Sequence, residues 1–156
     1  MTKTKPVADG SQTVTPYLIV RNATRALGFY REAFGAEELF RLTEPGGRIG
    51  HAELRIGDST IMLADEYPDF GALSPASIGG SPVRLHLRVD NVDAVMREAI
   101  AAGATELRAA KDEFYGERAG MLADPFGHQW FIASHIEDVS PEEMQRRFTK
   151  ALSSGG

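Results

Sequence analysis

Two stretches of the chain alternate between apolar and polar residues, and each predicts a β-strand with two unlike faces. Because side chains alternate across a strand, the apolar positions of residues 50–56 and of residues 83–89 share one face and the polar positions share the other. The polar positions are His51, Glu53 and Arg55 in the first stretch and Arg84, His86 and Arg88 in the second. We expect a helix over each apolar face, whereas the polar faces either line a cavity or meet solvent.

The remaining elements occur twice in the same order. Residues 22–36 (NATRALGFYREAFGA) and 90–104 (DNVDAVMREAIAAGA) have apolar residues at helical spacing. Asn22 is the expected cap of the first helix. Asp90 or Asn91 is the expected cap of the second. Strand-like runs lie at residues 15–21, 37–43, 50–56 and 60–65, and again at 83–89, 105–109, 119–124 and 128–135.

Similar sequence segments connect the predicted helix to the following strand in both halves of the chain. REAFGAEEL occupies residues 31–39 and REAIAAGATEL occupies residues 97–107. The repetition predicts an α+β fold built from two βαβββ modules. One helix can cover only one face of its sheet, so we expect the two mixed sheets to pair into a cupped, barrel-like cavity.

The predicted organisation has five parts. They are a disordered tail at 1–13, a first module at 14–66, a linker at 67–82, a second module at 83–136, and a C-terminal helix and tail at 137–156. Ser140 and Glu143 have the spacing of a capping box, and Pro141 suits the first helical position. They predict a helix from 141 to about 152, which packs on its own sheet or on a partner subunit.

Composition excludes several classes of protein. The 156 residues are 42% hydrophobic, which suits a globular chain with a real core. With no cysteine, the chain has neither disulfides nor a thiolate metal site. The net charge of -5 and the scattered basic residues argue against nucleic acid and membrane as partners. The first residues lack the apolar centre of a secretory signal, so a cytoplasmic location is expected.

Several motifs between residues 14 and 140 resemble one family. They are TPYLIV, GHAELRIGDSTIMLADE, FYGERAG and DPFGHQW. They are similar to the PhnB-like branch of the vicinal oxygen chelate superfamily, which groups glyoxalases, bleomycin resistance proteins and dioxygenases. The resemblance implies a cup of paired βαβββ modules, one divalent metal held by the first and last strands of each half, and a homodimer.

The family's metal-ligand positions fall on unsuitable residues in this chain. Three of the four positions lie near Thr15 or Tyr17, near Arg84 and near Phe131, and none of these side chains binds a divalent metal well. Glyoxalase-type metal catalysis at those positions is therefore not expected.

A displaced metal site is the alternative. His51 and Glu53 share a strand face, Asp65 ends the neighbouring strand, and His86 lies on the equivalent face of the second half. With His51, Asp65 and His86 as ligands, such a site would hold Zn, Ni, Mn or Fe. Without a metal, His51 would be a catalytic base, with Glu53 or Asp65 as its orienting partner.

Other residues are candidates for binding a substrate. Tyr115 and Arg118 lie in a charged, aromatic loop at residues 112–120, while Arg84 and His86 belong to the polar face described above. Trp130 either packs in the core or stacks a planar ligand. The preceding DPFGH segment has the residues of a turn, in which Asp124 caps its own backbone.

Two functional classes remain open. The first is an enzyme that acts on a small polar molecule in the sheet cavity, by lyase or isomerase chemistry assisted by a metal. The second is a protein that sequesters a small molecule or antibiotic without converting it. A complete ligand set or catalytic pair would favour the first class, and an aromatic cavity without a metal would favour the second.

Overall fold

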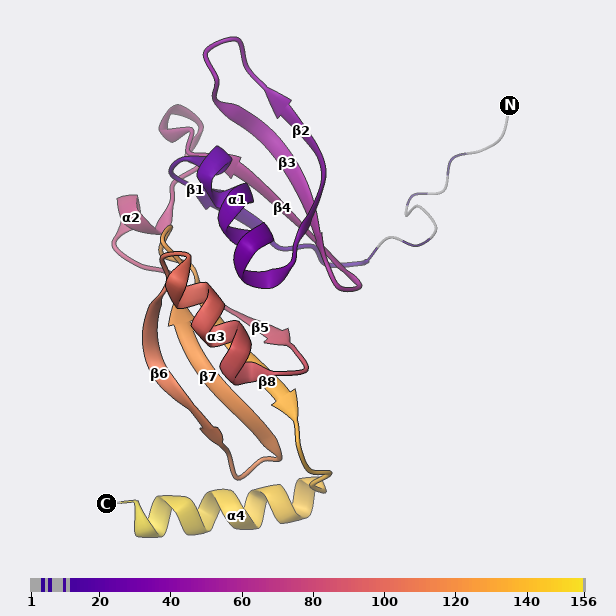
Figure 1. Ribbon diagram of the computed structural model, residues 1–156, viewed down its shortest axis with the longest axis vertical. Coiled ribbons are helices and arrows are strands. Elements are labelled where there is room, and N and C mark those ends of the chain that lie inside the picture. The colour runs from indigo at the N-terminus through magenta and orange to yellow at the C-terminus, as the bar shows by residue number, and fades with distance from the viewer. Residues whose placement is uncertain (1–3, 5, 7–9, 11, 156) are drawn as a thin grey trace. The chain divides into compact units, whose positions relative to one another are not determined.

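The structure is a computed structural model that describes residues 4, 6, 10 and 12–155. The chain divides into two compact units, Met1–Ile78 and Gly79–Gly156 (Figure 1). The division falls inside the linker predicted at 67–82. The predicted tail at 1–13 lies mostly outside the described residues; near its end, the side-chain amide of Gln12 pairs with the backbone of Thr60 at 2.8 and 2.9 Å.

The first unit has the predicted βαβββ order. Its elements are β1 (Tyr17–Val20), α1 (Ala23–Phe34), β2 (Glu37–Thr43), β3 (Ile49–Ile56) and β4 (Ser59–Asp65). The strands are ordered β1-β4-β3-β2, with β1 parallel to β4 and the other pairs antiparallel. The sheet is mixed because successive strands joined by hairpins run antiparallel, whereas β1 reaches its parallel partner only after a helix and two further strands.

The second unit repeats this topology. Its elements are β5 (Arg84–Arg88), α3 (Val92–Ala101), β6 (Thr105–Asp112), β7 (Glu117–Ala123) and β8 (Gln129–His135), ordered β5-β8-β7-β6. A terminal helix, α4 (Pro141–Ser154), follows. The predicted α+β class with two βαβββ modules and a C-terminal helix is therefore confirmed. A cavity shared by the two sheets stays a prediction.

Local capping fixes the helix starts. Asn22 takes a left-handed conformation with φ 65°, and its Oδ1 accepts a hydrogen bond from the backbone N–H of Arg25 at 3.2 Å. In the second unit Asn91, rather than Asp90, is the cap, and it accepts from the N–H of Ala94 at 3.0 Å. Asparagine suits both positions because its short amide satisfies a helical N–H that has no partner within the helix.

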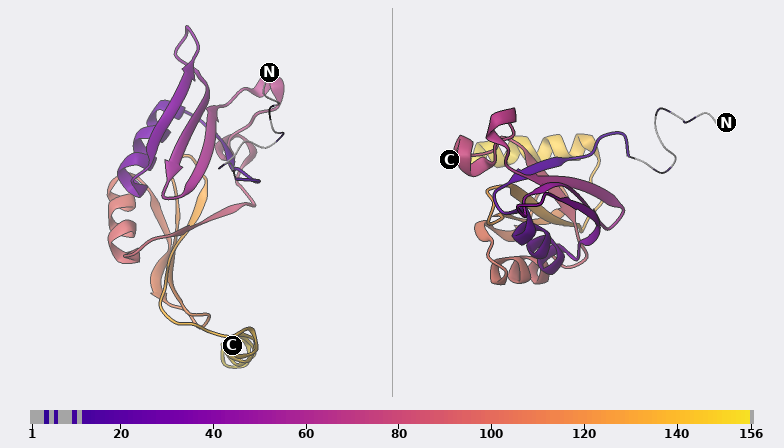
Figure 2. Two further views of the ribbon diagram at one scale, coloured as in Figure 1. Left: turned by 90° about the vertical axis from the view of Figure 1, so that its right-hand side faces the viewer. Right: turned by 90° about the horizontal axis from the view of Figure 1, so that it is seen from above.

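Each sheet has a helix on one face (Figure 2), and we call the opposite face its open face. In the first unit the buried residues of the helix side include Leu18, Val20, Leu27, Tyr30, Ala52, Leu54 and Leu63; in the second they include Val92, Met96, Leu122, Trp130 and Ile132. Gly120 lets α3 approach β7, because a Cβ there would lie 3.0 Å from Cε of Met96. The apolar face predicted for residues 50–56 therefore lies under α1, whereas in residues 83–89 Leu85 and Leu87 are half-buried and Val83 is 61% exposed.

Glu66 binds the linker to the first unit. The linker contains a short 3-10 helix, η1 (Pro68–Phe70), and one turn of helix, α2 (Pro75–Ile78). One oxygen of Glu66 accepts from the N–H of Ser74 at 2.7 Å, from its hydroxyl at 2.6 Å, and from the hydroxyl of Ser77. The other accepts from Nε of Arg21 at 3.2 Å. These bonds need the carboxylate to be ionised.

The Glu66 contacts predict acid-sensitive stability. The hydroxyl of Ser74, followed by that of Ser77, lowers the pKa of Glu66 from 4.5 to about 2. Because this pKa is lower in the folded chain, the stabilisation is present above about pH 4.5 and is lost as the pH falls toward 2. Glu66→Gln should therefore melt at a lower temperature than the parent at pH 6. The difference between the two melting temperatures should become smaller below pH 4.5. Thermal unfolding followed by circular dichroism measures this difference; a constant difference would contradict the assignment.

Helix α4 is attached mainly through Arg147. The guanidinium donates to the carbonyl of Phe114 at 2.9 Å and to both oxygens of Glu137 at 2.8 and 2.9 Å. Ser140 caps the helix as predicted, accepting from the N–H of Glu143 at 3.2 Å. The carboxylate of Glu143 pairs with Arg146 and Arg147.

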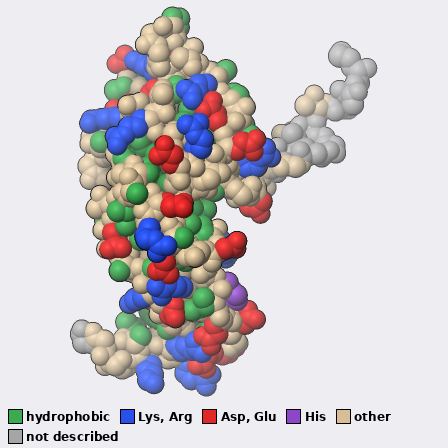
Figure 3. Space-filling view, viewed as in Figure 1, with side chains coloured by type: hydrophobic (Ala, Val, Ile, Leu, Met, Phe, Trp, Pro, Cys, Tyr) green, Lys and Arg blue, Asp and Glu red, His purple; other side chains and the backbone are tan. Residues whose placement is uncertain are grey.

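Charges of both signs lie interspersed on the face shown in Figure 3, including around α4. Across the described residues, none of the helices combines the length and apolar character needed to cross a membrane.

Candidate functional site

A hydrogen-bonded row of three side chains lies on the open face of the first sheet. The hydroxyl of Tyr17 is 2.8 Å from Nδ1 of His51, and Nε2 of His51 is 2.9 Å from an oxygen of Glu53. Tyr17 comes from β1, whereas the other two residues come from β3. Strand β4 lies between them, and Met62 is in register with both Tyr17 and Glu53. The long phenol side chain therefore spans β4 to reach the imidazole.

The chemistry of these groups fixes the direction of the bonds. An ionised Glu53 can only accept, so Nε2 of His51 carries the proton. Nδ1 is then an acceptor, and the phenol of Tyr17 donates to it. Burial, and next the charge of Glu53, raises the pKa of Tyr17, which keeps the phenol protonated. The row is therefore a relay in which a proton of Tyr17 can pass to His51 while Glu53 stabilises the resulting imidazolium.

Aromatic rings flank the imidazole. The ring centroid of His51 is 5.4 Å from that of Tyr17 and 5.7 Å from that of Phe40. Tyr17 is 46% exposed and Phe40 43% exposed, so both rings offer surface to a ligand. Leu42, opposite His51 in the register, is 59% exposed. The relay thus sits within a partly apolar surface, where a planar or amphipathic molecule would be favoured.

The structure does not bring Asp65 together with His51. Leu63 is paired with Ala52 on the helix side, and Asp65, two residues farther along β4, points to that same side. Its two oxygens accept from the backbone N–H of Ala23 at 2.7 Å and of Ile49 at 2.8 Å. Asp65 thus joins the start of α1 to β3, while His51 faces the opposite way.

His86 and Arg84 lie on the open face of the second sheet. Nε2 of His86 is 3.4 Å from a carboxylate oxygen of Glu117. Arg84 donates to Gln129 at 3.3 Å, and its guanidinium lies 5.6 Å from the ring centroid of Phe131. Within residues 12–155 no three His, Asp or Glu side chains are grouped closely enough to hold a metal ion. The metal site predicted from His51, Asp65 and His86 therefore gains no geometric support.

Arg118 faces the helix side of the second sheet. It forms a bidentate pair with Asp93 of α3, with both N–O distances 2.9 Å, and it also bonds Asp112 at 3.1 Å. The bond to Asp93, followed by that to Asp112, raises the pKa of the guanidinium. Arg118 thus fastens α3 to β6 and β7, so its donors are not directed to a ligand on the open face.

Trp130 lies in the core of the second unit and is 2% exposed. Its indole N–H donates to Asp124 at 2.9 Å. The other oxygen of Asp124 accepts from the N–H of Phe126 at 2.9 Å and of His128 at 3.0 Å. The DPFGH segment is therefore the predicted turn, and of the two roles considered for Trp130 the structure provides the packing role.

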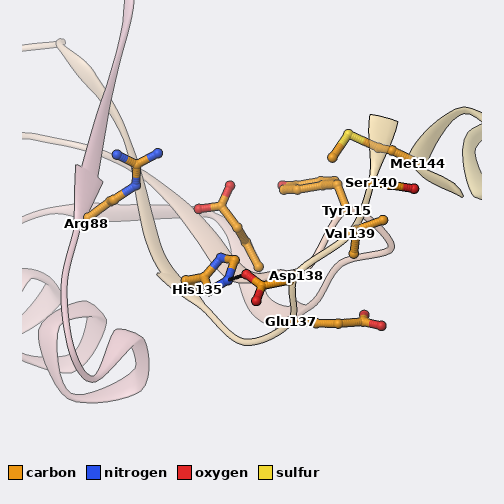
Figure 4. A pocket seen from close by; sticks show the side chains of 9 residues that line it. Arg88, Tyr115, His135, Glu137, Asp138, Val139, Ser140 and Met144 are labelled. Carbon is orange, nitrogen blue, oxygen red and sulfur yellow. Dashed lines mark hydrogen bonds and ion pairs between the residues drawn. The ribbon is translucent and has the colours of Figure 1, made fainter. Parts of the chain in front are cut away.

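Tyr115 lines a pocket of about 450 Å³ within the second unit. Figure 4 places Arg88 at one end and Tyr115, Val139 and Met144 at the other, with His135 and Asp138 between them. Glu117 of β7 also lines this pocket. His135 and Met144 were not among the predicted site residues, since no sequence spacing relates them to the other members of the pocket; Tyr17 was noted only as lying near a family metal-ligand position and was not predicted to contact His51.

Comparisons with known proteins agree with this fold. The profile of the Glyoxalase/Bleomycin resistance protein/Dioxygenase superfamily matches residues 11–132. An uncharacterized protein of Mycobacterium bovis is 42% identical over 146 residues, covering 92% of this chain and 93% of its own.

Solved structures with the same fold include a glyoxalase-related enzyme from Fulvimarina pelagi. It is 25% identical, with a TM-score of 0.64, and the match covers 80% of this chain and 88% of that one. A PhnB protein from Bacillus cereus, a putative 3-demethylubiquinone-9 3-methyltransferase, is 21% identical with a TM-score of 0.60, covering 79% and 99%. At that identity the second likeness extends to the fold alone.

Proposed function

The chain belongs to the Glyoxalase/Bleomycin resistance protein/Dioxygenase superfamily, and from this premise we propose that it is an enzyme that transfers a proton within a small polar substrate. The hydrogen-bonded row of Tyr17, His51 and Glu53 on the open face of the first sheet is the observation that carries the proposal. Isomerisation and elimination are the reaction types that such a relay serves.

Each member of the relay has a distinct task. Tyr17 contacts the substrate. When the substrate loses a proton to the phenolic oxygen, the phenol passes its own proton to His51; when the substrate gains a proton, the phenol donates one to it and takes one back from His51. His51 holds the proton at Nδ1 during the reaction. Glu53 keeps the imidazole in the required tautomer and stabilises its cationic form, as the third member of a catalytic triad does. Phe40 helps to exclude water from one side of the imidazole.

A divalent metal does not fit the residues at the family's ligand positions. Members of the superfamily often bind such a metal, and their ligands supply carboxylate or imidazole groups. By the family resemblance, three of the four corresponding positions fall near Thr15 or Tyr17, near Arg84 and near Phe131. A guanidinium and a phenyl ring have no lone pair to offer a cation, so we derive no step through a metal.

Exchange of substrate hydrogen with solvent tests the proposal without knowledge of the net reaction. The protein is incubated in D₂O with small hydroxy ketones and keto acids, and loss of C–H signal is followed by NMR. We expect exchange with at least one compound, and we expect Tyr17→Phe and His51→Gln each to slow it by about 100-fold. Glu53→Gln should slow it at least about tenfold, because a donating amide would favour the wrong imidazole tautomer.

Tyr67→Phe is the matched control for Tyr17→Phe, since Tyr67 belongs to the same unit but lies in the linker, beside Phe70. Its exchange rate should equal that of the parent. Exchange that continues at the parent rate in both Tyr17→Phe and His51→Gln would show that the relay is not the catalytic group.

Sequestration of a small molecule is the second candidate function. The exposed rings of Tyr17 and Phe40 and the exposed side chain of Leu42 favour it, because they offer a planar ligand an apolar surface. Binding without any hydrogen exchange would support this alternative. A homodimer and a cytoplasmic location remain part of either proposal.

A further inference from the structure

The pocket of the second unit has a charged end and an apolar end. Arg88 marks the charged end in Figure 4, and Tyr115, Val139 and Met144 form the apolar end. A second hollow of about 360 Å³ adjoins the apolar end and shares Tyr115 and Met144 with the first. The site is therefore roomy enough for a small molecule that has a polar head and an apolar side chain.

Two of the acids around the pocket have partners outside it or next to it. Glu137 is held by Arg147 through two bonds of 2.8 and 2.9 Å. Asp138 lies 2.6 Å from Nε2 of His135 and has a fully exposed side chain. The charge of Glu137 is therefore neutralised by Arg147, whereas Asp138, whose partner His135 is charged only when protonated, is fully exposed and its charge is screened by solvent.

Arg88 is different, because its guanidinium forms no hydrogen bond, ion pair or ring contact with any side chain or backbone group of the described residues. It reaches into the pocket from β5 as an available partner for an anion (Figure 4). A guanidinium binds a carboxylate especially well, because its parallel N–H groups match the two oxygens.

Glu117 is the corresponding partner for a cation. Its side chain is only 20% exposed, and its neighbouring base, His86, is 3.4 Å away and is charged only when protonated. Glu117 lies on β7 and Arg88 on β5, with β8 between them. Arg88 is in register with Ala133 of β8 and Glu117 with His135, two residues farther along. Two strand spacings and this offset separate their backbones by about 12 Å, and the inward reach of both side chains leaves room for a molecule whose two charges are close together.

The apolar end is uncharged over the physiological range. Burial, and next the charges of Glu113 and Glu117, raises the pKa of Tyr115, so its phenol stays neutral. Val139 and Met144 complete this wall. We propose that the pocket binds a small ammonium carboxylate with an apolar side chain, an α-amino acid or a close analogue. The carboxylate meets Arg88, the ammonium group meets Glu117, and the side chain lies against Tyr115 and Met144.

Three related probes test this assignment on the full chain. L-phenylalanine carries both charges, L-phenylalaninamide lacks the carboxylate, and N-acetyl-L-phenylalanine lacks the ammonium group. Titrations of ¹⁵N-labelled protein followed by NMR should give saturable shifts at the amides of Glu117, His135 and Val139. The dissociation constant for L-phenylalanine should be about tenfold lower than that of either derivative, as expected for losing one charged contact.

Variants connect each charge of the probe to one residue. Arg88→Gln should abolish the preference for L-phenylalanine over its amide, and Glu117→Gln should abolish the preference over the N-acetyl derivative. Arg97→Gln, on the exposed side of α3, is the control for charge and should bind as the parent does. His51→Gln should also bind unchanged, which separates this site from the proposed relay. Well-dispersed spectra confirm that each variant is folded.

The outcomes that would overturn the proposal are equally specific. They are equal dissociation constants of the three probes for the parent, preferences that survive in Arg88→Gln and Glu117→Gln, or no saturable shift up to roughly 50 mM, where even weak binding would be seen.

Discussion

Asp124→Ala should lower the free energy of unfolding of the second unit by about 5 kcal/mol, since it removes three hydrogen bonds to a buried carboxylate and such charge-assisted bonds contribute about 1.5–3 kcal/mol each. Asp124 is 4% exposed and accepts from the N–H groups of Phe126 and His128 and from the indole of Trp130. Alanine leaves all three donors without their acceptor in a place that water reaches poorly. A loss of this size is a large fraction of the stability of an ordinary domain.

Urea unfolding followed by tryptophan fluorescence measures this loss directly, because Trp130 is the only tryptophan of the chain and lies in the second unit. Asp124→Asn keeps one oxygen acceptor and should lose less, about 1–2 kcal/mol. Trp130→Phe removes one donor but leaves the turn intact; because this variant has no tryptophan, its unfolding is followed by circular dichroism. Equal stabilities of Asp124→Ala and Asp124→Asn would contradict a contribution from the oxygen that asparagine keeps, and an Asp124→Asn variant as stable as the parent would contradict a contribution from the charge and the second oxygen.

Asp65→Ala should destabilise the first unit by about 3 kcal/mol, because two charge-assisted bonds are lost and the start of α1 loses a favourable negative charge. The carboxylate accepts from the backbone of Ala23 and of Ile49, which belong to α1 and β3. Both N–H groups then lack their acceptor. Hydrogen exchange should show faster opening at these two amides.

The same variant distinguishes the structural role of Asp65 from the metal-ligand role predicted by the sequence pattern. EDTA removes bound metal, so a carboxylate that acts only as a metal ligand adds nothing to the free energy of unfolding in its presence. A carboxylate that accepts hydrogen bonds from backbone amides stabilises the fold equally with and without EDTA. We expect the loss of stability to be the same with and without EDTA. Unchanged protection at Ala23 and Ile49 in Asp65→Ala would refute the structural role. Glu44→Gln, in the turn after β2, is a suitable control because its side chain is exposed.

Features that depend on neighbours along the chain could be predicted from the sequence. Asn22 and Asn91 cap their helices because the amide reaches an N–H three residues ahead. The turn at Asp124 depends on contacts with residues two, four and six positions later. The pairing of His51 with Glu53 was predictable for the same reason, since residues two apart on a strand share a face.

Features that depend on strand order could not be predicted in this way. Tyr17 joins His51 only because β4 lies between β1 and β3 at a width that a phenol can cross. Arg118 was expected to meet a ligand, but the register of β7 turns it toward Asp93 of α3 and turns Glu117 toward the open face. A shift of one residue in register would exchange the two faces, and sequence alone does not reveal which face a helix will cover.

The sequence by itself determined the main strands and helices, the turn at Asp124, the repeated βαβββ order and the shared face of His51 and Glu53, because hydrogen bonds and alternation over a few residues decide these features. Only the tertiary structure decided that Tyr17 completes the relay, that Asp65 belongs to the start of α1, and that Arg88 and Glu117 border one pocket. Those outcomes depend on which strands become neighbours and in which register, and these in turn depend on burial of the whole apolar face rather than on any local segment.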